Sequence, residues 1–156
     1  MKDFNKKWNQ FLEQKGIKPK AVSFDFDDTL TLLDSEYNYK APNKFVVSLF
    51  NKFKEKGFKV LIVTSRMEKF ESDDNRLSVK DFVDEMGLKP DGIYFTEGQD
   101  KAPLLKNLDV VLHFDDDEYE WAALEAHAPH IKIAKIDYKS GKIFDGFKNI
   151  MKLIGI

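Results

Sequence analysis

The stretch that decides the fold of this chain is Ala21-Val22-Ser23-Phe24-Asp25-Phe26-Asp27-Asp28-Thr29-Leu30. Its first four residues form a short run that predicts a buried strand, and carboxylates follow directly. Asp25 and Asp27 would point the same way in an extended chain, whereas a turn that starts there separates them. Clustered carboxylates repel one another until a proton or a cation relieves the repulsion. The stretch therefore predicts a buried strand that ends in a charged site.

Four further apolar runs follow this strand, and helical patterns alternate with them. The runs are Val60–Val63, Ile93–Phe95, Val110–Phe114 and Ile131–Ile136, and the expected helices cover about residues 3–15, 43–56, 76–87, 101–107, 118–127 and 145–153. Such alternation predicts βαβ units and a parallel sheet. We therefore expect a three-layer, Rossmann-like α/β fold with helices on both faces of the sheet. Right-handed crossovers would bring the carboxyl ends of all strands to one edge, where such sheets bind ligands.

Composition limits the class of protein. The 156 residues suit a single domain over 1–156, and 42% of them are hydrophobic, which is enough for a core. The net charge of −2 provides no bulk basic field for nucleic acid or anionic lipid. The chain has no cysteine, which excludes disulfides, thiolate metal sites and a cysteine nucleophile.

The sequence contains no targeting or membrane signal that we recognise. The opening Met1-Lys2-Asp3-Phe4-Asn5-Lys6-Lys7 lacks the apolar run of a signal peptide, and no stretch is long and apolar enough to span a membrane. We expect a cytoplasmic protein without a membrane partner. Nothing in the sequence calls for an obligatory protein partner.

Polar side chains follow four successive strands of the expected sheet. Asp25 to Asp28 follow the first strand, Thr64-Ser65-Arg66 the second, Thr96-Glu97 and then Lys101 the third, and Asp115-Asp116-Asp117 the fourth. Because the carboxyl ends of parallel strands share one edge, these groups are expected to converge.

The converging groups suit phosphoryl transfer. Mg²⁺ prefers oxygen ligands and binds few carboxylates together with water and phosphate. A lysine such as Lys101 would offset the charge of a phosphate, and a hydroxyl such as that of Thr64 would donate to it. One carboxylate can attack phosphorus to form an aspartyl-phosphate, and a second can protonate the leaving oxygen and then activate water.

Each of these features also has a purely structural interpretation. Asp-x-Asp is common in turns, Thr64 could cap a helix, and Lys101 alone would be a solvated surface residue. The acids Asp115–Asp117 would suit the start of the following helix. A calcium-binding EF-hand loop starting at Asp25 is excluded because Leu30 occupies its glycine position. Only the joint placement of these residues after successive strands favours a site.

In this order, the residues resemble the haloacid dehalogenase (HAD) superfamily of phosphotransferases. The first motif of that family is an apolar strand followed by Asp-x-Asp-x-Thr-Leu, which residues 21–30 match. The second is a strand ending in Thr or Ser, the third a lone Lys, and the fourth a strand ending in paired acids. Leu61–Thr64, Lys101 and Leu112–Asp116 are similar to them.

The resemblance implies a role for each matching residue. Asp25 would be the nucleophile and a metal ligand. Asp27 would be the general acid/base and would bind the metal, Mg²⁺, through its backbone carbonyl. Thr64 and Lys101 would hold the phosphate.

The fourth motif would complete the metal site. Asp116 would be a metal ligand and Asp115 would support it, but three consecutive acids leave the register open and Asp117 remains a candidate. Lys106 is a weaker alternative to Lys101.

Members of this superfamily usually select substrates with cap insertions. The two insertion points here hold residues 31–59 and 67–100, which are too short for a subdomain after their helices and strands are counted. We therefore expect no large cap domain. Thr31–Ala41 has the place of the small hairpin flap found beside the nucleophile in this family.

An open site of this kind admits large substrates. Thr64-Ser65-Arg66 is similar to the Ser/Thr-x-Arg of polynucleotide 3′-phosphatase domains, and Phe114-Asp115-Asp116 to their Phe-Asp-Asp. The resemblance places Ser65 and Arg66 in substrate binding, whereas Arg76 could simply lie on a helix. It predicts a Mg²⁺-dependent phosphatase acting on a nucleotide or a nucleic-acid 3′-phosphate.

Two alternatives remain open at this point. One is a capless phosphatase of sugar, other small-molecule or protein phosphates. The other is a non-enzymatic phospho-acceptor module similar to a response-regulator receiver, which also places Asp, Thr and Lys at strand ends. A receiver, however, carries its phosphorylated Asp after the third strand, where this chain has Thr96-Glu97.

Overall fold

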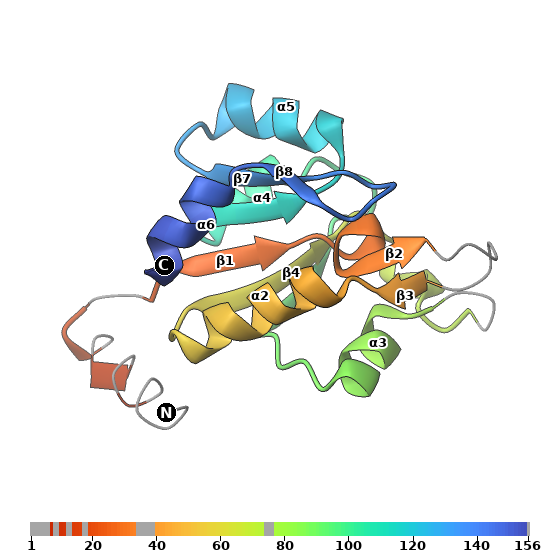
Figure 1. The fold of residues 1–156 in the computed structure, drawn as a ribbon, viewed down its shortest axis with the longest axis horizontal. Helices are drawn as coiled ribbons and strands as arrows, with labels where there is room; N and C mark the ends of the chain where they lie inside the picture. Colours follow the sequence, from red (N-terminus) through yellow and green to blue (C-terminus); the bar gives the residue numbers. More distant parts are fainter. Residues whose placement is uncertain are drawn as a thin grey trace.

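The computed structural model describes residues 19–33, 40–73 and 77–155, together with residues 7, 10, 11 and 14–16 ahead of them. The helix expected over residues 3–15 falls largely on residues outside this set, among them Phe4, Trp8 and Leu12. Figure 1 shows the described part as a central sheet with helices packed against it. None of the helices described is long and apolar enough to cross a membrane.

The sheet has six strands in the order β5-β4-β1-β6-β7-β8. Their bounds are Ala21–Phe24 (β1), Lys59–Thr64 (β4), Gly92–Phe95 (β5), Val110–Asp115 (β6), Lys132–Ile136 (β7) and Ile143–Asp145 (β8). β5, β4, β1, β6 and β7 pair in parallel, which confirms the predicted sheet. β8 pairs antiparallel with β7 and was not predicted, because three residues are too short to show a strand pattern.

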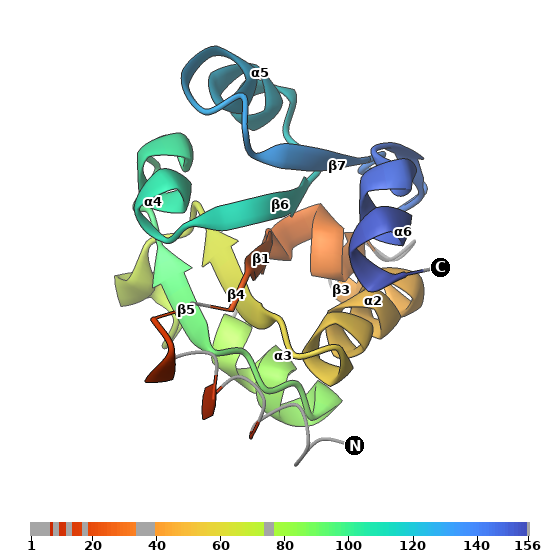
Figure 2. The ribbon, with the colours of Figure 1, turned by 90° about the vertical axis from the view of Figure 1, so that its left-hand side faces the viewer.

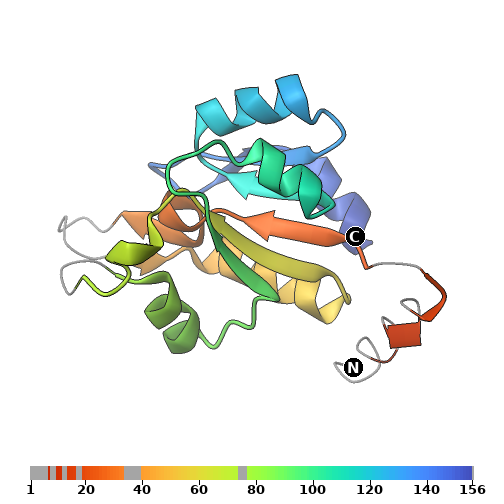
Figure 3. The same ribbon diagram turned by 180° about the vertical axis from the view of Figure 1, so that it is seen from behind.

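Helices cover both faces of the sheet, as expected for a three-layer α/β fold. They are α2 (Lys44–Glu55), α3 (Val79–Met86), α4 (Ala102–Asn107), α5 (Glu118–His127) and α6 (Phe147–Ile154). One hydrophobic cluster packs α2, α3 and α6 on one face, and a second cluster packs α4 and α5 on the other. Figure 2 shows this division along the sheet, and Figure 3 shows α4 and α5 from behind.

No large cap interrupts the described part of the chain. After the first strand, β2 (Thr31–Leu33) and β3 (Lys40–Pro42) form an antiparallel pair, which matches the expected flap. Between β4 and α4 lie one turn of 3₁₀-helix, η2 (Glu68–Phe70), then α3 and β5.

The end of β1 is anchored in the core by stacked phenylalanines. Phe24 and Phe114 are both fully buried, and their ring centroids are 4.2 Å apart at an interplanar angle of 11°. Phe50 of α2 lies 5.3 Å from Phe24 on the same side. Aromatic pairs of this kind stabilise a core beyond the area they bury. The stack fixes the end of β1 immediately before Asp25.

Replacing the buried ring should therefore destabilise the fold. We expect Phe24→Ala to lower the free energy of unfolding by about 3–5 kcal/mol, since it removes an aromatic side chain and leaves a cavity. Urea denaturation followed by circular dichroism measures this change. Phe70→Ala is the matched control, because Phe70 is 43% exposed and should cost little. Equal effects of the two substitutions would contradict the assignment of Phe24 to the core.

Candidate active site

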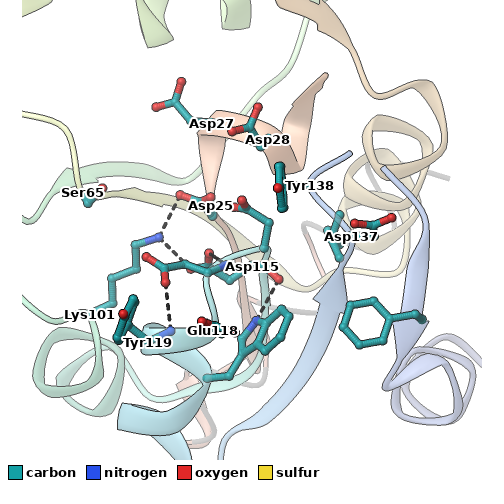
Figure 4. Close-up of a pocket in the computed structure, with 15 residues that line it drawn as sticks. Asp25, Asp27, Asp28, Ser65, Lys101, Asp115, Glu118, Tyr119, Asp137 and Tyr138 are labelled. Atoms are coloured by element: carbon teal, nitrogen blue, oxygen red, sulfur yellow. Dashed lines mark hydrogen bonds and ion pairs between the residues drawn. The ribbon is translucent and has the colours of Figure 1, made fainter. Parts of the chain in front are cut away.

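The chain turns sharply after β1, and the turn separates the two acids of the first motif. The backbone N–H of Asp25 donates to the carbonyl of Phe114 at 2.8 Å, which continues the pairing one residue beyond β1. A short irregular turn, η1 (Phe26–Leu30), follows, and the backbone angles of Asp27 and Asp28 within it are not helical. Within it Asp28 has φ 61° and ψ 19°, a left-handed conformation that aspartate tolerates. Asp25 consequently points toward Lys101, whereas Asp27 points away (Figure 4).

A buried lysine occupies the centre of the site. Lys101 flanks the start of α4 and is 2% exposed, and its Nζ donates to Asp25 at 2.8 Å and to Asp115 at 2.7 Å. Burial alone would lower the pKa of Lys101, but the two carboxylates outweigh burial and raise it above its usual value. Lys106, the alternative in the sequence, is exposed on α4. The structure thus brings Lys101, not Lys106, to Asp25.

The backbone of Lys101 is held as well. Its N–H donates at 3.0 Å to Glu120 of α5, a partner that no sequence motif indicates.

Asp115 is fully buried and its carboxylate is already well supplied with donors. Besides Lys101 it receives a 2.8 Å hydrogen bond from His113 Nε2 and one of 3.1 Å from the backbone N–H of Asp117. Burial would raise the pKa of Asp115, but Lys101 and His113 outweigh it and hold that pKa below its usual value. Asp115 therefore serves as a fixed negative charge behind Lys101.

His113 was not predicted as part of the site. Burial lowers the pKa of His113, which favours the neutral ring, and a neutral ring donates from only one nitrogen. Nε2 faces the Asp115 carboxylate, and Nδ1 lies 2.7 Å from the Ser23 hydroxyl, which can donate to it. The signal that could have found His113 is its place as a polar residue within the apolar run Val110–Phe114, because a buried polar side chain needs such partners.

Asp25 and Asp116 form the acidic face of the site. One oxygen of each lies within 4.8 Å of the other, and the Thr29 hydroxyl lies 3.1 Å from Asp25 and 3.3 Å from Asp116. Burial, and next the charge of Asp115, raise the pKa of Asp25 well above its usual value. Burial also raises the pKa of Asp116, to about 6. Two carboxyls so close together require a proton or a cation between them.

This donor set fits a small, hard divalent cation. Asp25, Asp115 and Asp116 each offer one oxygen, and these three oxygens lie within 4.8 Å of one another. Asp117, by contrast, caps α5 by accepting from the Tyr119 N–H at 2.9 Å. Of the three consecutive acids, Asp116 therefore has the best position to bind a cation directly.

The second motif lies beside η1. Thr64 ends β4, is 1% exposed, and accepts a 3.2 Å hydrogen bond at Oγ1 from the Arg66 N–H. Ser65 is exposed and lines the cavity. Arg66 Nε and Nη2 donate to the two oxygens of Asp27 at 2.7 and 2.8 Å, and Nη1 donates to the carbonyl of Leu77.

Arg66 does not line the cavity in this arrangement. Its side chain is 8% exposed, and a further carboxylate, Glu71, lies 3.5 Å from Nη1. The substrate contact expected for Arg66 remains a prediction; the contact that the structure provides is with Asp27. Arg76 lies outside the described residues.

A cavity of about 560 Å³ opens above these groups. Its floor is made by Asp25, Lys101, Asp115 and Asp116, and Asp27, Asp28 and Ser65 lie on one side. The remaining lining residues come from α5 and the β7–β8 region and include four aromatic residues, Tyr119, Trp121, Tyr138 and Phe144. None of these four was predicted, because they are scattered along the sequence and carry no motif.

Comparison with known proteins gives fold matches only. No family model and no curated protein matches the sequence. Among solved structures, a chain of the Pnkp1/Rnl/Hen1 complex is 18% identical with a TM-score of 0.58, over 78% of this chain and 47% of that one. The N-terminal part of a Bacteroides fragilis protein, containing a phosphatase domain complexed with Mg, is 13% identical with a TM-score of 0.55, over 92% and 43%.

A third match covers both chains almost fully. A putative HAD superfamily (subfamily III A) hydrolase from Legionella pneumophila is 16% identical with a TM-score of 0.51, over 97% of this chain and 90% of that one. The chain spans less than half the length of the first two structures. At sequence identities of 13%, 16% and 18%, these matches show a similarity of fold alone. The chain has the HAD-like fold that its motifs predicted.

A cation bound at the acidic face should stabilise the fold. We expect saturating Mg²⁺ to raise the melting temperature at pH 7.5, since a ligand that binds only the folded state stabilises it. The rise should shrink as the pH falls through about 6, because a proton on Asp116 then competes with the cation. Differential scanning fluorimetry measures both effects.

Two substitutions test which of the consecutive acids binds the cation, and the second is the matched control for the first. Asp116→Asn should abolish the Mg²⁺-dependent rise, whereas Asp117→Asn should retain it, because asparagine can still cap α5. Loss of the rise in Asp117→Asn alone would place the cation at Asp117 instead.

Removing the central ammonium should be costly at neutral pH. Lys101→Met leaves Asp25 and Asp115 buried without their shared counter-charge, and we expect the free energy of unfolding to fall by about 3–5 kcal/mol at pH 7. The loss should persist down to about pH 4 and narrow only below that. Stabilisation from Asp115, whose pKa is lowered in the folded state, is present above its unfolded pKa and is lost on acidification.

Denaturant titrations at several pH values measure this difference. Lys106→Met, on the exposed side of α4, is the control and should change little at any pH. A loss for Lys101→Met that does not depend on pH would contradict the charge argument.

Proposed function

We propose that this chain is a Mg²⁺-dependent phosphatase that hydrolyses phosphomonoesters through an aspartyl-phosphate on Asp25. The observation that carries the proposal is that one carboxylate, Asp25, contacts a buried ammonium at 2.8 Å and lies within 4.8 Å of a second acid, Asp116. A nucleophile, a fixed positive charge and a cation-binding face thus meet at the edge of the sheet where such folds bind ligands. The HAD-like fold and the Mg-complexed phosphatase domain with a similar fold support it.

Asp25 supplies the nucleophile in this mechanism. One of its oxygens attacks phosphorus while the bond from phosphorus to the leaving oxygen breaks. Lys101, held against Asp25 and Asp115, offsets charge on the phosphoryl oxygens without having to move into place. When bound, Mg²⁺ would neutralise phosphate charge and favour the ionised form of the surrounding carboxylates.

Asp27 is the proposed general acid/base. It would protonate the leaving oxygen and later take a proton from the water that attacks the aspartyl-phosphate. The two-point contact with Arg66 fixes where this carboxylate lies. We assign Arg66 a positioning role toward Asp27, and Thr64 and Ser65 a role as hydroxyl donors to the phosphate. A nucleotide or a nucleic-acid 3′-phosphate is the proposed substrate.

The nucleophile assignment has a direct test. Asp25→Asn keeps the shape of the side chain but removes its charge, and we expect Mg²⁺-dependent hydrolysis of p-nitrophenyl phosphate to fall by about 10⁴-fold or more. Phosphate release measures the rate, and circular dichroism checks the fold. Asp84→Asn, on the exposed side of α3, is the control and should retain full activity. Unchanged turnover in Asp25→Asn would refute the proposed nucleophile.

A further inference from the structure

Exposed aromatic side chains line the same cavity as the acidic face. We use the name aromatic wall for Tyr119 and Trp121 of α5, Tyr138 of the β7–β8 turn and Phe144 of β8. Tyr119 is 79% exposed, Phe144 60% and Tyr138 51%. A single exposed aromatic residue needs no explanation, but several around one cavity that holds a reactive carboxylate mark a binding surface. Figure 4 shows Tyr119 and Tyr138 among the side chains that line this cavity together with Asp25.

The wall is attached to the floor of the cavity. Trp121 Nε1 donates a 3.0 Å hydrogen bond to the backbone carbonyl of Asp115. The ring of Phe144 packs edge-on against Trp121, with centroids 5.5 Å apart. Part of the wall is thereby held in a fixed relation to the proposed phosphate site. A ring bound on it would lie at a set distance from Asp25.

The charges of the residues that line the cavity disfavour a polyanionic leaving group. Among the described residues that line it, Lys101 is the only cation, and that ammonium already contacts Asp25 and Asp115. The cavity side of the wall carries the carboxylates Asp117, Glu118 and Asp137 instead. Binding a nucleic-acid strand depends on basic residues along its phosphates. A strand with several phosphates therefore meets, among the described lining residues, no cation other than the one at its terminal phosphate.

A cationic leaving group is also disfavoured. Lys135 Nζ lies 5.2 Å from the centre of the Trp121 ring, and Lys139 Nζ lies 5.7 Å from that of Tyr138. These two rings already interact with an ammonium, so a ligand cation would gain less from them and would be repelled by the lysines. A neutral, planar group that stacks on a ring face suits the wall best.

We infer that the aromatic wall binds the base of a nucleoside monophosphate whose single phosphate lies at Asp25. This inference rests on the proposed phosphatase function and narrows its substrate from nucleotides or strand ends to mononucleotides. A base has the neutral planar face that the wall requires, and the monoester supplies the one phosphate that the floor can hold. The volume of about 560 Å³ lies within the range of small-molecule sites.

The experiment compares four substrates with Mg²⁺ present. They are a nucleoside 5′-monophosphate, the matching 3′-monophosphate, ribose 5-phosphate and a 3′-phosphorylated oligonucleotide. We expect kcat/KM for at least one mononucleotide to exceed that for ribose 5-phosphate and for the oligonucleotide by about tenfold or more, since stacking of one base contributes about 1–3 kcal/mol. Preference for the oligonucleotide or for ribose 5-phosphate would overturn the inference.

Substitutions in the aromatic wall test whether it recognises the base. Tyr119→Ala and Tyr138→Ala should each lower the ratio of kcat/KM for the mononucleotide to that for ribose 5-phosphate by about fivefold or more. Phe147→Ala is the control, because Phe147 is an exposed aromatic residue of α6 outside the cavity lining, and the ratio should not change. Equal losses for both substrates in both tyrosine variants would contradict base recognition.

A binding measurement separates failure of this inference from failure of the proposed function. Isothermal titration calorimetry of Asp25→Asn with the mononucleotide and with ribose 5-phosphate measures the affinity for each ligand in the absence of turnover. If no substrate is hydrolysed by the unmodified protein, the phosphatase proposal fails. In that case, tighter binding of the mononucleotide than of ribose 5-phosphate, weakened by Tyr138→Ala, would still support base binding by the aromatic wall. Equal binding of the two ligands would overturn the inference.

Discussion

The ammonium of Lys101 lies between the carboxylates of Asp25 and Asp115, and the rest of the site depends on that contact. Like charges brought together inside a protein are costly unless a counter-charge is present. One lysine from the start of α4 meets acids that follow β1 and end β6, so it ties three elements together at the sheet edge. It cannot balance Asp116 as well, and the uncompensated charge is what makes this face suitable for a cation.

Packing in the core places Asp25 and Asp115 next to Lys101. Phe24 and Phe114 are paired in the register of β1 and β6, and their stacked rings are buried beneath the sheet edge. Asp25 and Asp115 are the next residues on the two strands. Because successive side chains of a strand alternate, a slip of one residue would exchange a core ring for a carboxylate. The packing that stabilises the fold therefore also fixes the positions of Asp25 and Asp115 at the ends of their strands.

The sequence predicted the parts of the molecule that local patterns determine. The five parallel strands follow from compact apolar runs, and the acids were found because they come directly after two of those runs. Glu120, His113 and the aromatic wall were not found as site residues, since their positions depend on which elements the fold brings together. Arg66 shows the same limit. The sequence showed that Arg66 lies two residues after Thr64, but it did not show that two of its nitrogens donate to Asp27.

Asp25 and Asp27 are the same residue type two positions apart, yet they have different surroundings. Asp25 is buried beside Lys101, and its pKa is raised by burial and by neighbouring acids. The Asp27 side chain is 29% exposed and faces a guanidinium. Carboxylates in contrasting environments commonly divide acid–base and nucleophilic work between them. A raised pKa would weaken Asp25 as a nucleophile, and a cation shared with Asp116 reverses that effect. The electrostatics of the acids themselves thus favour the divalent cation that the proposed mechanism uses, apart from any family resemblance.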